Sequence, residues 1–441
     1  MTATVERPAA PAPAPGGVCR LLAPVLRGVF GGPPPIGVRA WDGSTLGPLD
    51  GPVLVLRTRD ALRRLLWNPG ELGLARAYVT GEIDVEGDLA EGFRRIRLMG
   101  SGARPSPATA AHALRALLAV RAVGRPLPAP RSEARLKGRL HTPARDRAAI
   151  AHHYDFSNDF YALLLDSRMA YSCAYYTRPD AGLEEAQAAK LDLVCRKLAL
   201  RPGMRFLDVG CGWGALAVHA AREYGARVTG VTLSREQAAL ARERAAGLPV
   251  EIRVQDYRAV DDGPYDAVSS IEMGEHVGEG NYPVFASALH RLVRPRGRVL
   301  VQQMSRGAHA PGGGAFIERY IAPDMHMRPV GDTVALLEQA GLEVVDVHAL
   351  REHYVRTVAD WSATFDSRRD EIAALVGEEA ARVWRLYLVG GASAFEQGRM
   401  GVDQILMVRP DGAGASGLPL AREALLQGKP VPGEGTGEGP S

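Results

Sequence analysis

The chain has 441 residues, of which 46% are hydrophobic, 23% charged and 6% aromatic, and at about 100 to 200 residues per domain this length predicts two or three domains. The near-average composition excludes wholesale disorder and a coiled coil, and a net charge of +3 is too small to indicate a nucleic-acid-binding protein. No apolar run reaches the roughly 18 to 20 residues needed to cross a bilayer, so we expect a soluble, cytoplasmic protein.

The two ends of the chain have the composition of flexible tails. Residues 1–20 are rich in Pro and Ala, and residues 409–441 are rich in Gly, Pro and Glu. Neither segment carries enough apolar surface to offset the entropy lost on ordering. The first 20 residues also lack the basic and then apolar pattern of a secretory signal. We therefore predict a flexible tail at each end.

An N-terminal domain is predicted over residues 21–125. Residues 36–57 alternate apolar and polar side chains between Gly and Asp turns, which predicts short antiparallel strands. Helical patterns follow to about residue 123. A proline-broken stretch then predicts an interdomain linker over residues 126–145.

Positive charge is concentrated around this linker. Residues 101–150 contain ten Lys or Arg against two acidic residues, with Leu, Ala and Val interleaved. Such a segment can sit on anionic lipid, where each cation contributes about 1 kcal/mol. An ordinary solvated linker with one amphipathic helix explains the same pattern. The residues alone leave both interpretations open.

A second domain, predicted over residues 146–408, alternates strands and helices. The strands are expected at Arg205–Val209, Arg227–Val231, Val250–Val254, Tyr265–Ile271, Arg298–Met304 and Leu342–His348. Helical stretches lie between them. This alternation predicts an α/β fold with a doubly wound, mostly parallel sheet.

The cysteines give no sign of a disulfide scaffold or a metal site. They are Cys19, Cys173, Cys195 and Cys211. They form no C-x-x-C pair, and none has His partners at zinc spacing. We expect reduced thiols and no bound metal.

The strongest chemical signal is the segment RFLDVGCGWGALAVHAA at residues 205–221. A strand ends at Asp208, and a turn with Gly210, Gly212 and Gly214 leads into a helix. Glycines there let the backbone approach a ligand closely, although a tight strand-to-helix turn explains them equally well. The spacing is not G-x-G-x-x-G, and the next strand ends in GVTLS without the acidic residue that holds a nicotinamide ribose. Both departures count against a dehydrogenase.

Several segments together resemble a known family. A class I methyltransferase that binds S-adenosylmethionine is indicated by LDVGCGWG with GVTLSREQ. The resemblance narrows to the cyclopropane fatty-acyl-phospholipid synthase family, including the mycolic acid cyclopropane synthases, on HHYDFSNDFYALLLDSRMAYSCAYY, SIEMGEHVGEGNY and LYLVGGASAFEQGRMGVDQILMVRP. It covers about residues 150–410, while residues 70–89 resemble the lipid-binding N-terminal domain of longer members. The resemblance implies a Rossmann-like methyltransferase domain and a smaller α+β lipid-binding domain.

The resemblance also assigns cofactor contacts. The positions that match are Tyr171, Ser172, Gly210, Gly212, Thr232, Leu233, Gln237 and Tyr257. Tyr257 stands where some members have Trp, and its ring can stack on adenine; without the resemblance, a half-buried core aromatic is an equal interpretation. Asp208 looks like the acid of the first strand, which orients the turn or binds the methionine ammonium.

The implied reaction needs one base in a dry pocket. Methyl transfer to an alkene leaves a carbocation, which water would convert to an alcohol, so the site must exclude water and remove a proton. In the family that base is a bound bicarbonate, held by a Cys main chain and by Glu, His and Tyr side chains. Cys173, Glu275 and Tyr354 match three of these positions, and Gln302 stands in place of the His. Gln donates a hydrogen bond but carries no titratable charge, which leaves bicarbonate binding open.

Further departures concern the product. Glu272 stands where many cyclopropane synthases have Gly, Gly274 where they have Phe, and Gly391 where many have Cys. Loss of the Phe is expected to open volume and to remove a ring face that could stabilise a cation. The added carboxylate of Glu272 could hold the cation or take its proton, with a paired structural carboxylate as the alternative. The segments LVGG, EQGRMGVDQI and QQMS resemble the actinobacterial branch that makes 10-methylene fatty acyl chains.

These observations predict an S-adenosylmethionine-dependent C-methyltransferase. It acts on the cis double bond of phospholipid-bound acyl chains at the inner face of the membrane and gives a 10-methylene product, with a cyclopropane product as the alternative. A flavin- or nicotinamide-dependent reductase is the expected functional partner, since a methylene needs reduction to become a methyl branch. A catalytically degenerate lipid-binding protein and a small-molecule or RNA methyltransferase are the remaining alternatives. Nucleic acid is not an expected partner, and assembly of identical copies stays open.

Overall fold

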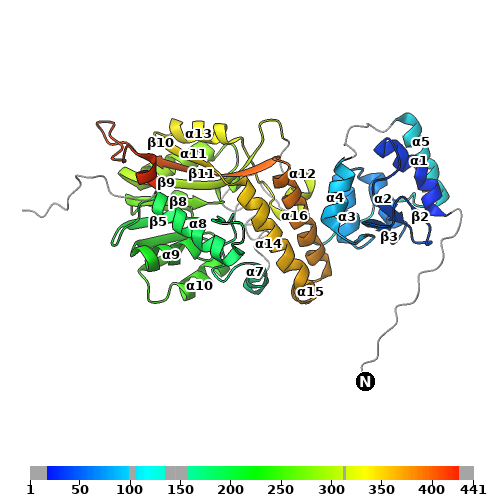
Figure 1. Ribbon diagram of the computed structural model, residues 1–441, viewed down its shortest axis with the longest axis horizontal. Coiled ribbons are helices and arrows are strands. Elements are labelled where there is room, and N and C mark those ends of the chain that lie inside the picture. The colour runs from blue at the N-terminus through cyan, green and yellow to red at the C-terminus, as the bar shows by residue number, and fades with distance from the viewer. Residues whose placement is uncertain (1–16, 99–105, 135–144, 146–156, 311–313, 427–441) are drawn as a thin grey trace, which may run out of the picture. The chain divides into compact units, whose positions relative to one another are not determined.

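The computed structural model describes residues 17–98, 106–134, 145, 157–310 and 314–426, which fall into two compact units (Figure 1). The first unit is Met1–Glu133 with Gly377–Ser393, and the second is Ala134–Val376 with Ala394–Ser441. The sequence-based domain limits stay a prediction, because residues 135–144 of the expected linker, and much of the basic stretch, lie outside the described residues. The units differ from those limits at helix α16 (Glu378–Glu396), most of which belongs to the first unit.

The first unit contains a four-stranded sheet with strand order β2-β1-β3-β4. The strands are β1 (Gly37–Arg39), β2 (Thr45–Leu46), β3 (Val53–Leu56) and β4 (Ile83–Glu86). Strand β1 is antiparallel to β2 but parallel to β3, so the antiparallel pairing predicted for residues 36–57 is only partly right. The helices are α1 (Val18–Phe30), α2 (Asp60–Trp67), α3 (Glu71–Val79), α4 (Leu89–Leu98) and α5 (Pro107–Ala119).

One buried arginine explains why α16 belongs to the first unit. Arg382 donates from Nε to the carbonyl oxygen of Tyr78 at 2.5 Å and from Nη2 to that of Ile83 at 2.7 Å. Its guanidinium also lies 4.2 Å from the centre of the Tyr78 ring and pairs with Asp84. These contacts join residues about 300 positions apart, which local sequence patterns cannot predict.

The second unit is built on a seven-stranded sheet with strand order β10-β11-β9-β8-β5-β6-β7. The strands are β5 (Arg205–Val209), β6 (Arg227–Thr232), β7 (Val250–Val254), β8 (Tyr265–Ile271), β9 (Val293–Arg306), β10 (Glu343–Ala349) and β11 (Met400–Val408). The predicted α/β fold with a mostly parallel sheet is confirmed. Strand β11 was not predicted; it pairs antiparallel with both β9 and β10.

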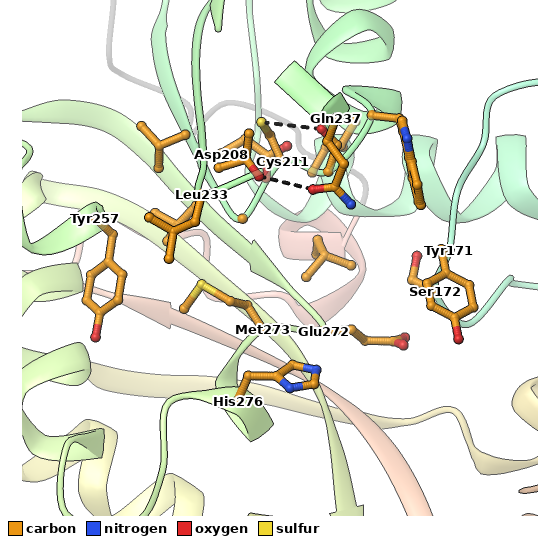
Figure 2. Close-up of a pocket in the computed structure, with 18 of the residues that line it drawn as sticks. Tyr171, Ser172, Asp208, Cys211, Leu233, Gln237, Tyr257, Glu272, Met273 and His276 are labelled. Carbon is orange, nitrogen blue, oxygen red and sulfur yellow. Dashed lines mark hydrogen bonds between the residues drawn. The ribbon is translucent and has the colours of Figure 1, made fainter. Parts of the chain in front are cut away.

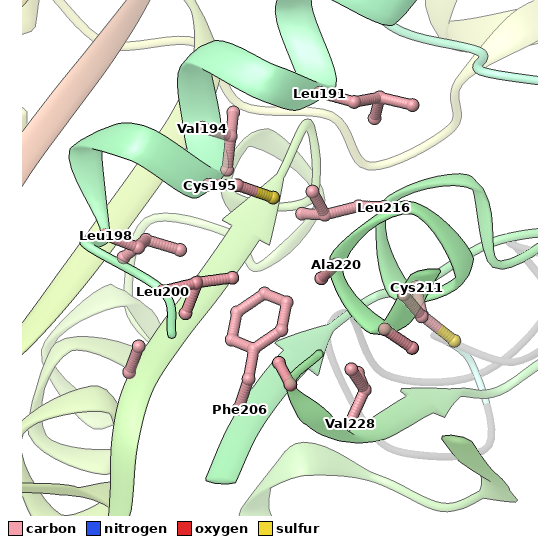
Figure 3. Packing of buried hydrophobic residues seen from close by; sticks show 14 of the residues in the cluster. Leu191, Val194, Cys195, Leu198, Leu200, Phe206, Cys211, Leu216, Ala220 and Val228 are labelled. Atoms are coloured by element: carbon pink, nitrogen blue, oxygen red, sulfur yellow. The ribbon is translucent and has the colours of Figure 1, made fainter. Parts of the chain in front are cut away.

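Helices cover both faces of this sheet (Figure 1). They are α7 (Asn158–Leu164), α8 (Leu183–Lys197), α9 (Ala215–Tyr224), α10 (Arg235–Arg244), α11 (Tyr282–Leu292), α12 (Gly314–Phe316), α13 (Val330–Gln339), α14 (Arg351–Ser367), α15 (Arg369–Val376) and α17 (Arg422–Leu426). Side chains alternate along a strand, so Phe206 packs under α8 and α9 (Figure 3) while Leu207 packs under α11. No helix in the described part of the chain is long and apolar enough to cross a membrane.

The predicted C-terminal tail is partly ordered. Residues 1–16 and 427–441 lie outside the described residues, but residues 409–426 are described and pack on the second unit. Leu425 is buried in the cluster that contains Phe206, and Arg422 donates to the Asp346 carboxylate at 2.5 Å. These two contacts cannot be predicted from the Gly- and Pro-rich composition of the segment. The sequence therefore predicted a flexible tail.

Candidate active site

A cavity lies in the second unit at the carboxyl ends of β5, β6 and β8, the edge of a parallel sheet where ligands commonly bind. Its wall includes all nine residues predicted to contact the cofactor: Tyr171, Ser172, Asp208, Gly210, Gly212, Thr232, Leu233, Gln237 and Tyr257. Figure 2 shows Tyr257 and Leu233 on one side of the cavity and Tyr171, Ser172 and Glu272 on the other. The structure therefore brings the predicted contacts together, and their binding role stays a prediction.

The glycine turn after β5 presents backbone to this cavity. Gly210 and Gly212 both have left-handed backbone angles, with φ of +80° and +53°, which glycine adopts at little cost. A Cβ on Gly210 would approach the Met273 side chain to 3.2 Å, whereas a Cβ on Gly212 would meet no atom within 4 Å. Space beside Gly212 is thus left open for a ligand.

Asp208 is a buried acid near the carboxyl end of β5. It is 2% exposed, and its Oδ1 accepts a hydrogen bond from Ser269 Oγ at 2.7 Å. Burial raises the pKa of Asp208 to about 6, against the lowering effects of the Ser269 hydrogen bond and the Lys190 charge. The group therefore stays mostly ionised at neutral pH and can face a cationic ligand group.

Lys190 lies in the cavity wall, and sequence analysis missed it. This α8 residue is 2% exposed, and its Nζ donates to Ser172 Oγ at 2.7 Å. Burial lowers the pKa of Lys190, while the charges of Glu272, Asp166, Cys173 and Asp208 raise it. One sequence feature could have indicated that Lys190 is buried. It lies one helical turn after Gln187, which also faces inward and donates to the Ser172 carbonyl oxygen. Met273 and His276 are further wall residues that were not predicted.

The far side of the cavity is formed after β6 and β7. Thr232 Oγ1 donates to Gln237 Oε1 at 3.1 Å, and Ser234 Oγ accepts from the Gln237 main chain at the start of α10. Tyr257 packs edge-on against Phe285, with ring centres 5.5 Å apart. Its ring therefore has a fixed position in the wall, as a stacking partner for a planar group requires.

Glu272 is the one predicted catalytic residue that lines the cavity among the described residues. Its carboxylate accepts three hydrogen bonds: Oε1 from the Cys173 main-chain N at 2.7 Å and Gln302 Nε2 at 2.8 Å, and Oε2 from Tyr354 Oη at 2.6 Å. Three residues expected to hold bicarbonate thus hold a side chain of the protein. Glu272 has φ of +49°, a conformation that costs a residue with a side chain about 1–2 kcal/mol.

Glu275 occupies a different environment from Glu272. It is 1% exposed, is not part of the described cavity wall, and its Oε2 has no hydrogen-bond partner among the described residues. Burial, and then the charge of Glu272, raise the pKa of Glu275 to about 8, so it is mainly protonated at neutral pH. The pKa of Glu272 is also raised above its usual value, because the effect of burial exceeds the lowering effects of the hydrogen bonds from Tyr354, Cys173 and Gln302 and of the Lys190 charge.

Cys173 contributes its main chain rather than its thiol. The thiol is fully buried, and burial raises its pKa well above the usual value. Its Sγ lies 3.4 Å from the carbonyl oxygen of Ala174. A nucleophilic role for this sulfur would require a thiolate, which the surroundings disfavour.

The space expected at Gly274 is filled, so that prediction was wrong. A Cβ on Gly274 would lie 2.0 Å from Gln303 Oε1. Gln303 is fixed there because its Oε1 accepts from Tyr282 Oη at 2.6 Å and its Nε2 donates to Thr333 Oγ1 at 3.3 Å. At Gly391, in α16, a Cβ would meet no atom within 4 Å.

Comparisons with known proteins agree with this geometry. Residues 141–405 match the family described as mycolic acid cyclopropane synthetase. A probable fatty acid methyltransferase of Pseudomonas putida is 39% identical over 405 residues, which cover 89% of this chain and 96% of the relative. The tuberculostearic acid methyltransferase UfaA1 of Mycobacterium tuberculosis is 34% identical over 387 residues, 83% of this chain and 86% of the relative. The crystal structure of the mycolic acid cyclopropane synthase CmaA1 with SAH and CTAB has a TM-score of 0.57 at 34% identity, covering 59% of this chain and 97% of that one.

Proposed function

The chain belongs to the mycolic acid cyclopropane synthetase family, and we propose that it methylates the cis double bond of phospholipid-bound acyl chains to give a 10-methylene product. The coarser activity, S-adenosylmethionine-dependent C-methylation of lipid acyl chains, is that of the family. One observation carries the proposal of methyl transfer followed by proton removal: the wall that holds all the predicted cofactor contacts also presents the carboxylate of Glu272. A methyl donor and a proton acceptor thus share one cavity.

The residues present fit S-adenosylmethionine. Gly212 leaves open space for the ligand, Asp208 can face its ammonium, and the buried cation of Lys190 can face its carboxylate. Its remaining contacts are proposed at Tyr171, Ser172, Gly210, Thr232, Leu233, Gln237 and Tyr257. When bound, this cofactor supplies an electrophilic methyl group on a sulfonium.

The protein's own contribution begins with positioning and with the exclusion of water. An alkene is a weak nucleophile, and holding it in line at attack distance can supply roughly 7 to 11 kcal/mol. A chain of packed aromatic rings runs from the cavity wall toward Tyr354. The pairs are Trp213–Tyr161, Tyr161–Tyr171, Tyr171–Trp361 and Trp361–Tyr354, with ring centres 4.6, 5.5, 5.3 and 6.0 Å apart. Such faces shield a carbocation from water and favour its charge.

The product depends on which proton leaves the substrate. In the proposed path a hydride moves from the methylated carbon to its neighbour, and the new methyl then loses a proton to give an exocyclic methylene. Ring closure after proton loss would give a cyclopropane, which is the alternative product. Similarity to UfaA1 over 83% of this chain supports the methylene, and similarity to the Escherichia coli cyclopropane-fatty-acyl-phospholipid synthase, 37% identical over 61% of this chain, supports the alternative. A methylene product implies a separate flavin- or nicotinamide-dependent reductase.

The acyl substrate sets where the enzyme works. We place it at the inner face of the membrane as a peripheral protein, with the N-terminal unit and the basic stretch at residues 101–150 as the lipid-facing parts. If this is so, activity on anionic vesicles falls as salt rises, because the attraction is screened beyond about 8 Å at 0.15 M ionic strength.

The test uses the full-length protein, S-adenosylmethionine and vesicles of a phospholipid with oleoyl chains. Gas chromatography of the transmethylated lipids separates methylene from cyclopropane products, and calorimetry measures S-adenosylhomocysteine binding. We expect binding and a mainly methylene-branched chain. Binding without any modified lipid would favour a catalytically degenerate lipid-binding protein, and methyl transfer that needs no lipid would favour a small-molecule or RNA methyltransferase.

A further inference from the structure

The carboxylate of Glu272 is held as a preorganised acceptor. A main-chain N–H, a side-chain amide and a phenol converge on it from three separate segments, at 2.6 to 2.8 Å from its oxygens. The residue follows β8 and has a left-handed backbone (φ +49°), and its side chain points toward Tyr171 and Ser172 on the same side of the cavity (Figure 2). Strained backbone that persists beside a cavity is a common sign of a functional position.

The neighbours of Glu272 are hydrogen-bond donors, so its carboxylate must act as the acceptor. The Cys173 main-chain N–H can only donate. Gln302 is oriented by Gln404, whose Nε2 donates to Gln302 Oε1 at 2.9 Å, so Gln302 turns its NH2 group toward Glu272. Because both donors meet Oε1, that oxygen cannot carry a proton. Oε2, bonded to Tyr354, is the oxygen on which a proton can be received.

The donors around Glu272 leave little role for an external anion. Cys173, Gln302 and Tyr354 are three of the four positions expected from the sequence to hold bicarbonate, and each already donates to Glu272. The fourth, Glu275, is buried and is not part of the described wall. We propose that the Glu272 carboxylate is the built-in base of the reaction and takes the place of bicarbonate. This rests on the proposed function.

The step balances with groups already present. A C–H bond of the cationic substrate breaks, its electron pair becomes the new C=C bond, and the proton moves to Oε2 of Glu272. The substrate loses its positive charge and the carboxylate loses its negative charge. Lys190 favours the ionised form before the transfer, and the proton returns to solvent after product release.

The first measurement needs no variant. Wild-type turnover is compared in carbonate-depleted buffer and in buffer with added bicarbonate, and binding of 13C-labelled bicarbonate is followed by NMR. We expect equal turnover and no bound bicarbonate signal. A wild-type enzyme that loses turnover on depletion and regains it with bicarbonate would overturn the inference, while a wild-type enzyme that makes no methylated lipid in either buffer would overturn the proposed function instead.

Two substitutions sharpen the result. Glu272→Gln keeps the size and can keep all three hydrogen bonds, so S-adenosylhomocysteine binding should persist while turnover falls about 100-fold or more, the scale of general-base loss. Glu272→Gly leaves the three donors without their acceptor, so added formate or bicarbonate should restore turnover and labelled bicarbonate should now bind. A Glu272→Gln enzyme with wild-type turnover would refute the role of this carboxylate, as would a Glu272→Gly enzyme that neither anion rescues.

The matched control is Asp403→Asn. Asp403 is also a buried carboxylate of the same sheet, and it accepts from Ser305 Oγ at 2.6 Å. It precedes Gln404 in β11, so its side chain points to the opposite face, and it is outside the described cavity wall. Turnover near the wild-type level is expected for Asp403→Asn. If Asp403→Asn lost as much turnover as Glu272→Gln, the loss in Glu272→Gln would come from a weakened sheet. That result would overturn the role of Glu272 as the base.

Discussion

The two halves of the cavity are built in different ways. On one side, most of the residues predicted to contact the cofactor come from short continuous segments, such as β5 and the glycine turn from Gly210 to Gly214 that follows it. On the other side, the carboxylate of Glu272 is held by Cys173, Gln302 and Tyr354, which are far apart in the chain. The first half is therefore visible as a motif, while the second exists only in the folded protein.

The difference also separates what the two halves do. Backbone that approaches a ligand closely can bind the same cofactor in many enzymes. The group that accepts the proton, by contrast, determines which product forms from the carbocation. Substitution of one side chain can change this group. We therefore expect substitutions in the cofactor half to affect binding, and substitutions in the base half to affect rate, pH dependence and product.

The largest effect is expected for Gly212→Val. The position has φ of +53°, and a side chain there would project into the open space beside the turn, so S-adenosylhomocysteine affinity should fall by about 100-fold or more, as expected when about 3 kcal/mol is lost. Calorimetric titration measures it. Gly203→Val is the control, since Gly203 has φ of +82°, also has no atom within 4 Å of a Cβ, and is outside the described wall. Near-native affinity in a folded Gly212→Val protein would contradict the assignment.

A smaller effect, on rate and pH dependence, is expected for Tyr354→Phe. The change removes the donor to Oε2 of Glu272, and a hydrogen bond to a charged group contributes about 1.5–3 kcal/mol, so turnover should fall about 10- to 100-fold. A donor lowers the pKa of a carboxylate, so its loss should raise the pKa of Glu272 further. The base works only when ionised, and the acid limb of turnover should therefore move to higher pH.

The pH profiles of wild type and Tyr354→Phe decide this point, with cofactor affinity as the control. Cofactor affinity should be unchanged, because Tyr354 is not part of the described wall. A lower turnover with an unshifted acid limb would make Tyr354 a packing residue, whose ring contacts that of Phe395 with ring centres 4.4 Å apart.

The smallest effect is expected in the product ratio. Ring closure and methylene formation share their first transition state, so a difference of about 1.4 kcal/mol between later ones changes the ratio tenfold. We expect Glu272→Gly, alone or with Gln302→His and supplied with bicarbonate, to raise the cyclopropane share. Gas chromatography of transmethylated lipids measures the ratio. The same ratio in active variants would remove both residues from the explanation of product choice.

The sequence predicted the fold correctly, and the residues it proposed as cofactor contacts lie in one cavity wall, because both predictions depend on local patterns. Strands β5 to β8 follow from apolar runs, and the glycine turn follows from spacing. Strand β11 was missed because Asp403 and Gln404 interrupt its apolar run, and α16 was assigned to the second domain because the contacts of Arg382 with Tyr78 and Ile83 cross about 300 positions.

The residues around the proposed base were named as candidates from the sequence, but the hydrogen bonds between them were not predicted. Glu272, Gln302 and Tyr354 were all identified, yet nothing in their spacing shows that the last two donate to the first. The filling of the space at Gly274 by Gln303 was missed for the same reason. Lys190 was overlooked because a lysine in a helix usually faces solvent, whereas this one is buried in the wall.

The central claim is that one cavity transfers a methyl group to a cis double bond and then removes a proton with its own carboxylate, which gives a methylene-branched chain. The most direct measurement supplies oleoyl phospholipid vesicles and S-adenosylmethionine with a trideuterated methyl to the wild-type enzyme in carbonate-depleted buffer, followed by gas chromatography and mass spectrometry. The account predicts a methylene-branched chain whose added carbon has lost one deuteron. A mainly cyclopropane product, or a product that forms only after bicarbonate is added, would contradict it.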